Sequence, residues 1–230
     1  DTSVREDYYL GIVAFGRGEA GPDRDTAAAK DLFQRAAAEA ERLGLSEMRE
    51  LSTLMLGRVL ALRGQYDEAV ALYERSISAH PDGQDRCRRT FYRGALAEIL
   101  GRMLEAGLGG RHHERARALR EELSGAGERY QACQEGAREQ FQGQLGWVRL
   151  LLSLPLQEIT TEHAARMAAI LKEARAGGTP GIRWEAEELT ARLSEATGRP
   201  AEARALYERL IRRAQAQERG ATELRLLVFL

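Results

Sequence analysis

The sequence is poor in the residues that β-strands, disulfide frameworks and membrane spans require. Aromatic residues make up only 6% of the 230 residues, and Val, Ile and Thr, which also favour strands, are scarce. The two cysteines, Cys87 and Cys133, lie far apart without a CxxC pair, so we expect two reduced thiols. No apolar run approaches the ~20 residues that span a bilayer. The best one, Trp147 to Leu156, is interrupted by Arg149, and we expect no membrane association.

An excess of charge of either sign is also missing. The net charge is −1, so no global field favours nucleic acid or an anionic membrane. The basic residues are almost all arginine, with Lys30 and Lys172 as the only lysines, which suggests a GC-rich bacterial genome. No signal peptide is visible in a chain that begins at Asp1, and we expect a cytoplasmic protein.

Helix-forming residues dominate what remains. Ala, Leu, Arg and Glu are the commonest residues, and all four favour helices. A content of 43% hydrophobic and 30% charged residues is typical of a folded protein and excludes wholesale disorder. The composition therefore predicts an all-α fold.

One segment, Glu50 to Gly83, carries a recognisable repeat signature. A Leu-Gly pair and a following Leu are succeeded by a Gly-Gln-Tyr-Asp-Glu-Ala turn, a Tyr and a Pro: Leu56, Gly57, Leu60, Gly64, Gln65, Tyr66, Asp67, Glu68, Ala69, Tyr73 and Pro81. This pattern resembles the tetratricopeptide repeat, whose 34-residue unit is a pair of helices. Thr53 and Ser76 depart from the family's Trp and second Ala. Small residues at such positions allow two helices to cross closely.

Two further segments resemble the same repeat. Residues 184–217 contain Ala191, Pro200, Ala203 and Tyr207 at matching spacing. Residues 7–43 contain Leu10-Gly11, Ala29, Phe33 and Ala36 around a longer turn, as in the family's variants of roughly 40 residues. Between them, residues 84–176 are degenerate. There, Gly94 and Gly146 could each mark a first helix, residues 111–124 and 160–176 would be their second helices, and residues 130–154 would form one long helix.

The resemblance implies a right-handed superhelical α-solenoid over residues 1–230, with about five helix pairs. A final partial helix is expected at residues 221–230. The apolar character of Leu224 to Leu230 leads us to expect that the full protein continues, as one part of a larger bacterial signalling or effector protein.

Residues that could carry chemistry are isolated. Neighbouring helical residues point about 100° apart, so the His112-His113 pair cannot face one metal ion. Cys87 lies among arginines, which could make it reactive, but no histidine with a catalytic signature accompanies it. Residues 107–110 are Gly-rich without a phosphate-binding form, and a turn is the simpler interpretation. We therefore expect no enzymatic activity, no cofactor and no metal.

The family's binding groove is lined by the first helix of each repeat. Carried over to this chain, its positions predict a partner-binding set that comprises Tyr8, Phe15, Arg58, Arg88, Phe91, Trp147 and Arg192. Many of these side chains could instead pack against neighbouring helices. Residues 86–120 contain nine Arg and three Glu residues, which favours an acidic protein or peptide partner, a solvated helix face, or nucleic acid. Homo-oligomerisation through residues 221–230 is a further alternative.

Overall fold

The computed structural model shows an all-α protein. It describes residues 2–18, 25–80, 86–108, 110–123, 137–155 and 159–216, and within these ranges it contains ten α-helices, one short 3-10 helix and no strand. The predicted all-α class is confirmed. None of the helices in these ranges combines the length and the apolarity that a membrane crossing demands. The chain divides into two compact units, residues 1–81 and 82–230.

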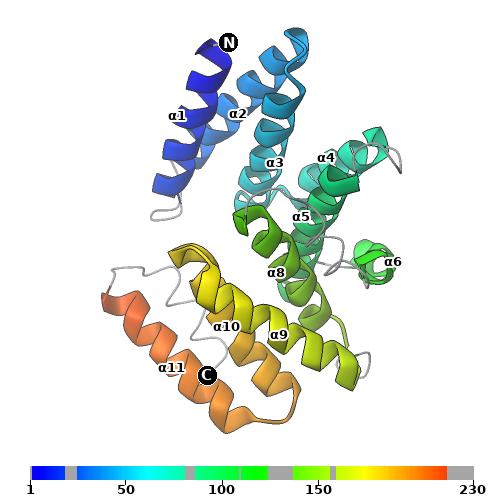
Figure 1. Cartoon of the computed structure of the whole chain (residues 1–230), viewed down its shortest axis with the longest axis vertical. Coiled ribbons are helices and arrows are strands. Elements are labelled where there is room, and N and C mark those ends of the chain that lie inside the picture. Colours follow the sequence, from blue (N-terminus) through cyan, green and yellow to red (C-terminus); the bar gives the residue numbers. More distant parts are fainter. Residues whose placement is uncertain are drawn as a thin grey trace. The chain divides into compact units, whose positions relative to one another are not determined.

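Unit 1 contains four helices that pack in chain order (Figure 1): α1 (Thr2–Gly18), α2 (Asp25–Arg42), α3 (Ser46–Leu62) and α4 (Tyr66–Ala79). The turns after α2 and α3 each contain a glycine, Gly44 and Gly64, with φ of +68° and +72°. Only glycine adopts this left-handed conformation readily. The turns therefore reverse the chain within three residues and place consecutive helices side by side.

Each helix pair of unit 1 is closed by a small residue that faces an aromatic ring. A Cβ atom added to Gly57 would lie 2.3 Å from Cε1 of Tyr73 on α4, and one added to Gly11 would lie 2.7 Å from Cε1 of Phe33 on α2. Both rings are fully buried. The Tyr73 hydroxyl also donates a hydrogen bond to the carbonyl oxygen of Leu54 at 2.7 Å. The glycine and aromatic positions of the sequence signature are therefore two halves of one packing contact.

Unit 2 contains six α-helices in its described residues. They are α5 (Arg86–Glu105), α6 (His113–Leu123), α8 (Ala137–Ser153), α9 (Thr161–Gly177), α10 (Pro180–Ala196) and α11 (Pro200–Ala216); a 3-10 turn, Gly110–His112, precedes α6. The last pair repeats the plan of unit 1, because Ala191 of α10 and Tyr207 of α11 belong to one buried cluster. Residues 124–136 and 217–230 lie outside the described ranges, and so do the first part of the predicted long helix and the predicted helix at 221–230.

The contact between α5 and α8 uses glycine differently. A Cβ atom added to Gly146 would lie 2.2 Å from the carbonyl oxygen of Gly94, and one added to Gly101 would lie 2.9 Å from Cγ of Arg149. Gly94 and Gly146, which could each mark a first helix, thus lie against each other, and α5 and α8 touch backbone to backbone.

Candidate protein-binding surface

A stripe of half-buried apolar side chains runs along α1 and α3 in unit 1. On α1 these residues are spaced by four and three positions, and on α3 by three and eight, so each set lies on one side of its helix. The α3 set ends at Leu62, which is 49% exposed. The stripe comprises Tyr8, Ile12 and Phe15 on α1, and Leu51, Leu54 and Leu62 on α3. We call these six residues the apolar stripe.

Contacts from α2 hold one end of the apolar stripe in place. The Tyr8 ring meets the ring of Phe33 edge to face, with centroids 5.9 Å apart, and meets the ring of Tyr9 at 5.5 Å. Because Phe33 is fully buried, Tyr8 rests on a fixed support and presents only part of its ring to solvent. Such an aromatic loses little rotamer entropy when a partner covers it.

Two arginines accompany the apolar stripe. Arg5 lies one turn before Tyr8 and is exposed, and Arg58 lies between Leu54 and Leu62 and is half-buried. The surface therefore combines apolar side chains with positive charge. Of the predicted partner-binding set, Tyr8, Phe15 and Arg58 belong to this unit, and all three retain some exposed surface.

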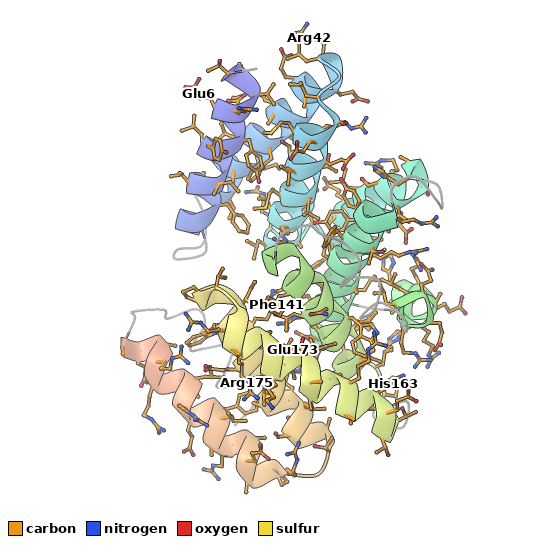
Figure 2. The ribbon with its side chains drawn as sticks, in the orientation of Figure 1. Glu6, Arg42, Phe141, His163, Glu173 and Arg175 are labelled. Atoms are coloured by element: carbon orange, nitrogen blue, oxygen red, sulfur yellow. The ribbon has the colours of Figure 1, made fainter. Side chains whose placement is uncertain are left out.

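The predicted binding residues in unit 2 lie in a different environment. Phe91 is 8% exposed and Trp147 only 2%. The guanidinium of Arg166 lies 4.7 Å above the Trp147 ring, and the ring of His163, at the start of α9 (Figure 2), meets it edge to face. Arg88 belongs to α5, but its side chain lies outside the described residues. Their burial gives Phe91 and Trp147 a packing role within the unit.

Arg192, the last of the predicted set, belongs to a buried ionic cluster that sequence reasoning missed. At its centre the Arg149 guanidinium, 1% exposed, lies 3.0 Å from carboxylate oxygens of both Glu105 and Glu185 and 3.7 Å from Glu188. Arg192 pairs with Glu105 and also donates to the Leu152 carbonyl oxygen at 3.3 Å. The cluster joins α5, α8 and α10, which are the first helices of their pairs.

Burial and pairing act against each other in this cluster. Burial by itself would raise the pKa of Glu105, but Arg149 and Arg192 outweigh it and hold the pKa of this carboxyl below its usual value. Burial would likewise lower the pKa of Arg149, but Glu188, Glu105 and Glu185 raise it well above its usual value. Glu105 and Arg149 are therefore both charged near neutral pH, and they form an ion pair at the centre of the cluster.

One signal in the sequence could have revealed this cluster. Arg149 interrupts the apolar run from Trp147 to Leu154, and an arginine on the buried face of a helix must have carboxylate partners. The identity of those partners was not predictable. Glu105 lies 44 residues and Glu185 36 residues away in the sequence, and glutamate is abundant throughout the chain.

The described residues considered for metal or phosphate binding do not lie together in one site. Among the described residues, no group of three or more His, Cys, Asp or Glu side chains could hold a metal ion. His112 ends the short 3-10 turn and His113 begins α6. Gly107, with φ of +72°, ends α5 in a tight turn in which the Leu108 amide donates to the Met103 carbonyl at 2.8 Å. The Gly-rich segment therefore acts, over its described residues, as a helix stop.

The arrangement defines a class of protein built from helix pairs, in which a small residue of one helix faces an aromatic ring of the next. Within that class, the family model of the tetratricopeptide repeat matches residues 52–86, which contain most of α3 and all of α4. The chain thus contains a tetratricopeptide repeat at residues 52–86. No curated protein and no solved structure matches the chain.

Proposed function

We propose that this protein is a non-enzymatic scaffold that binds a protein or peptide segment through the apolar stripe on α1 and α3. Tetratricopeptide repeats commonly mediate protein–protein interactions. The observation that carries the proposal is the set of six large apolar side chains that remain partly exposed along two neighbouring helices. A soluble domain seldom leaves such a stripe open unless a partner covers it.

The two arginines indicate the chemistry of the partner. Arg5 and Arg58 would meet acidic side chains of a bound segment, while the apolar stripe would accept its aliphatic or aromatic residues. Arginine and aromatic residues are the usual hot spots of interfaces. We therefore infer a partner segment with apolar residues at helical or extended spacing and at least one Asp or Glu.

Nucleic acid is the weaker alternative. The arginine-rich stretch from residue 86 to 120 is offset by glutamates: Arg93 and Arg115 both pair with Glu122, at 2.9 and 2.7 Å, and Arg102 pairs with Glu98 at 3.0 Å. Positive charge that is neutralised within the fold is less available for phosphate contacts. A larger bacterial signalling or effector protein remains our proposal for the setting in which this scaffold acts.

Selection from a displayed peptide library would test the proposed function. We expect wild-type protein to enrich peptides that combine apolar and acidic residues. Binding of these peptides should weaken at least about tenfold in the Leu62→Ser and Arg5→Glu variants, because hot-spot residues typically contribute 2 kcal/mol or more. Both side chains are exposed, so neither substitution should disturb the fold.

Leu108→Ser is the matched control, since Leu108 is also an exposed leucine, at 56%, but belongs to unit 2. Its affinity for the selected peptides should equal that of the wild type. Peptides that bind all three variants and the wild type equally would refute the proposal, and so would a selection that enriches no peptide.

A further inference from the structure

The crossing of α5 and α8 contains a second glycine that would fit the same close contact. On α8, Gly146 faces Gly94 of α5, and Gly143 precedes Gly146 by three residues, which is close to one turn. All three glycines are buried. Because glycine lets another backbone approach closely, either glycine of α8 would fit opposite Gly94.

The aliphatic residues of α8 would permit the same exchange. If α8 moved along α5 by three residues, or about 4.5 Å, Gly143 would take the place of Gly146. Leu145 would then take the place of Val148, and Val148 that of Leu151, so one buried aliphatic side chain would replace another. Protein cores tolerate exchanges of this kind best. Glycine and aliphatic packing therefore discriminate weakly between these two registers, that is, between two positions of α8 along α5.

Arg149 distinguishes the two registers. Its side chain lies over Gly101 of α5, because a Cβ atom added to Gly101 would lie 2.9 Å from Cγ of Arg149. The guanidinium then reaches Glu105, one turn further along α5, and donates to its two carboxylate oxygens at 3.1 and 3.0 Å. It also donates to Glu185 of α10 at 3.0 Å. In the shifted register Gly146 would occupy the place of Arg149 and would offer these carboxylates no cation.

The hydrogen bonds of Arg149 are sensitive to the position of α8. The two helices run in the same direction, so the shift would carry Arg149 toward the end of α5, where Glu105 is the last residue. A displacement of about 4.5 Å is much larger than the range of distances that a hydrogen bond tolerates. Arg149 is 1% exposed, so water would not replace the lost acceptors. The shifted register therefore leaves a buried guanidinium poorly paired.

We propose that Arg149, through its contact with Glu105, fixes the register of α8 along α5 and selects the one in which Gly146 faces Gly94. Buried ion pairs often add little net stability compared with neutral side chains of similar size, but they can specify one arrangement. Because α8 also packs on α9 and α10, its register decides where these helices lie within unit 2. This role goes beyond the peptide binding proposed for unit 1.

Fluorine NMR of the two tryptophans would test the proposal. Trp147 lies two residues before Arg149, and Trp184 directly precedes Glu185. Labelled with 5-fluorotryptophan, the wild-type protein should give two sharp resonances, one for each ring. In the shifted register Trp147 would take the place of Leu150, so a second register should add a resonance for Trp147.

The main variant neutralises the cluster with side chains of similar size: Arg149→Met, Glu105→Gln, Glu185→Gln and Glu188→Leu. It should stay folded, because neutral side chains can replace a buried ion-pair cluster without a net loss of stability. Arg192 would keep the Leu152 carbonyl oxygen as an acceptor. The variant should give at least three resonances, because both registers would be populated.

Two further variants separate the contact with α5 from other ion pairs of unit 2. Glu185→Gln/Glu188→Leu keeps Arg149 and Glu105 and should give two resonances, as the wild type does. The matched control is Arg213→Met/Glu187→Gln. It removes an ion pair and a guanidinium that lies 5.2 Å from the centre of the Trp184 ring, but it leaves the crossing of α5 and α8 unchanged. It should also give two resonances, with that of Trp184 shifted.

A neutralised variant with only two sharp resonances would overturn the proposal, because the register would then not depend on Arg149. A neutralised variant that is unfolded without urea would overturn it too, because the cluster would then be required for folding itself. Additional resonances in Glu185→Gln/Glu188→Leu would show that the contact with Glu105 does not fix the register, and they would count equally against the proposal.

Discussion

Unit 1 and unit 2 both use glycine to bring helices together, but the groups that the glycines admit differ. In unit 1, Gly57 makes room for the ring of Tyr73, a side chain. In unit 2, Gly146 makes room for the carbonyl group of Gly94, which is backbone. A contact made through a side chain lets one helix of a pair also pack against a further helix on its other side. The backbone contact between α5 and α8 leaves less room between these two helices. It places Arg149 beside Gly101 and close to α10.

The surfaces of the two units differ in the same way. The first helices of unit 1 expose apolar side chains, whereas the first helices of unit 2 hold a closed ionic cluster. Because both carboxylate oxygens of Glu105 accept hydrogen bonds from arginines, that cluster offers little to a partner. This contrast is why the proposed binding surface belongs to unit 1.

The largest effect is expected from removing the centre of the cluster. Arg149→Ala would leave Glu105, Glu185 and Glu188 close together without their shared cation, and we expect a loss of about 3–5 kcal/mol in the free energy of unfolding. Both tryptophans, Trp147 and Trp184, belong to unit 2. Tryptophan fluorescence in a urea titration therefore measures this unit selectively. Arg149→Lys keeps the positive charge but has a different donor geometry. Its free energy of unfolding should lie between those of the wild type and Arg149→Ala.

An exposed ion pair supplies the control for this variant. Arg204 is 74% exposed and pairs with Glu208 at 3.2 Å within α11. Arg204→Ala should change the free energy of unfolding by no more than about 0.5 kcal/mol. Equal losses in Arg149→Ala and Arg204→Ala would show that the buried cluster does not stabilise unit 2.

Adding one methyl group at Gly57 and at Gly146 would test the difference between the two glycine contacts. Gly57→Ala and Gly146→Ala should each lower the free energy of unfolding by about 1–3 kcal/mol, because the new Cβ atom overlaps a packed neighbour. Shortening the neighbouring side chain should distinguish the two glycine sites. With Tyr73→Leu, much of the cost of Gly57→Ala should disappear in a double-mutant cycle. No substitution can trim the carbonyl group that opposes Gly146.

Gly181→Ala is the matched helical control. An added Cβ there meets no atom within 4 Å, so alanine should be neutral or should stabilise α10 by up to about 1 kcal/mol. Circular dichroism reports both units and fluorescence reports unit 2. A Gly146→Ala variant as stable as Gly181→Ala would contradict the close crossing of α5 and α8.

Acid should weaken unit 2 through Glu105. Its pKa is lower in the folded protein than in the unfolded chain. The stabilising contribution is therefore complete above the unfolded value of about 4.3 and is lost as the pH falls through the folded pKa. Glu105→Gln should be less stable than the wild type at pH 7, and the difference should shrink toward pH 3. A difference that stays constant over this range would count against the ion pairs.

A smaller loss of stability than at the buried cluster is expected at the start of α9. The Thr160 hydroxyl accepts a hydrogen bond from the His163 amide at 3.1 Å, and the Thr160 amide donates to Nδ1 of His163 at 3.4 Å. Neither α3 nor α4 in unit 1 has a side-chain cap. Thr160→Ala should cost about 1 kcal/mol in urea denaturation followed by fluorescence. An unchanged midpoint would show that this cap contributes nothing measurable.

Much of the fold was predictable because its contacts are local. Gly57 and Tyr73 lie 16 residues apart and belong to one helix pair, so a short sequence pattern describes both sides of their contact. The same holds for Ala191 and Tyr207. The candidate site was predictable only in part, since Tyr8, Phe15 and Arg58 are half-buried but Trp147 and Phe91 are buried inside unit 2. Periodicity places a residue on a helix face without saying what covers that face.

The sequence by itself determined the helices, their glycine turns and the pairs that carry the repeat signature, because these depend on residues close together in the chain. Only the tertiary structure decided that Gly94 faces Gly146, that Arg149 meets glutamates from α5 and α10, and that Tyr9, Leu10 and Val13 stay exposed. Those outcomes depend on which helices meet across tens of residues, and many glutamates and leucines at equivalent helical positions could have met instead.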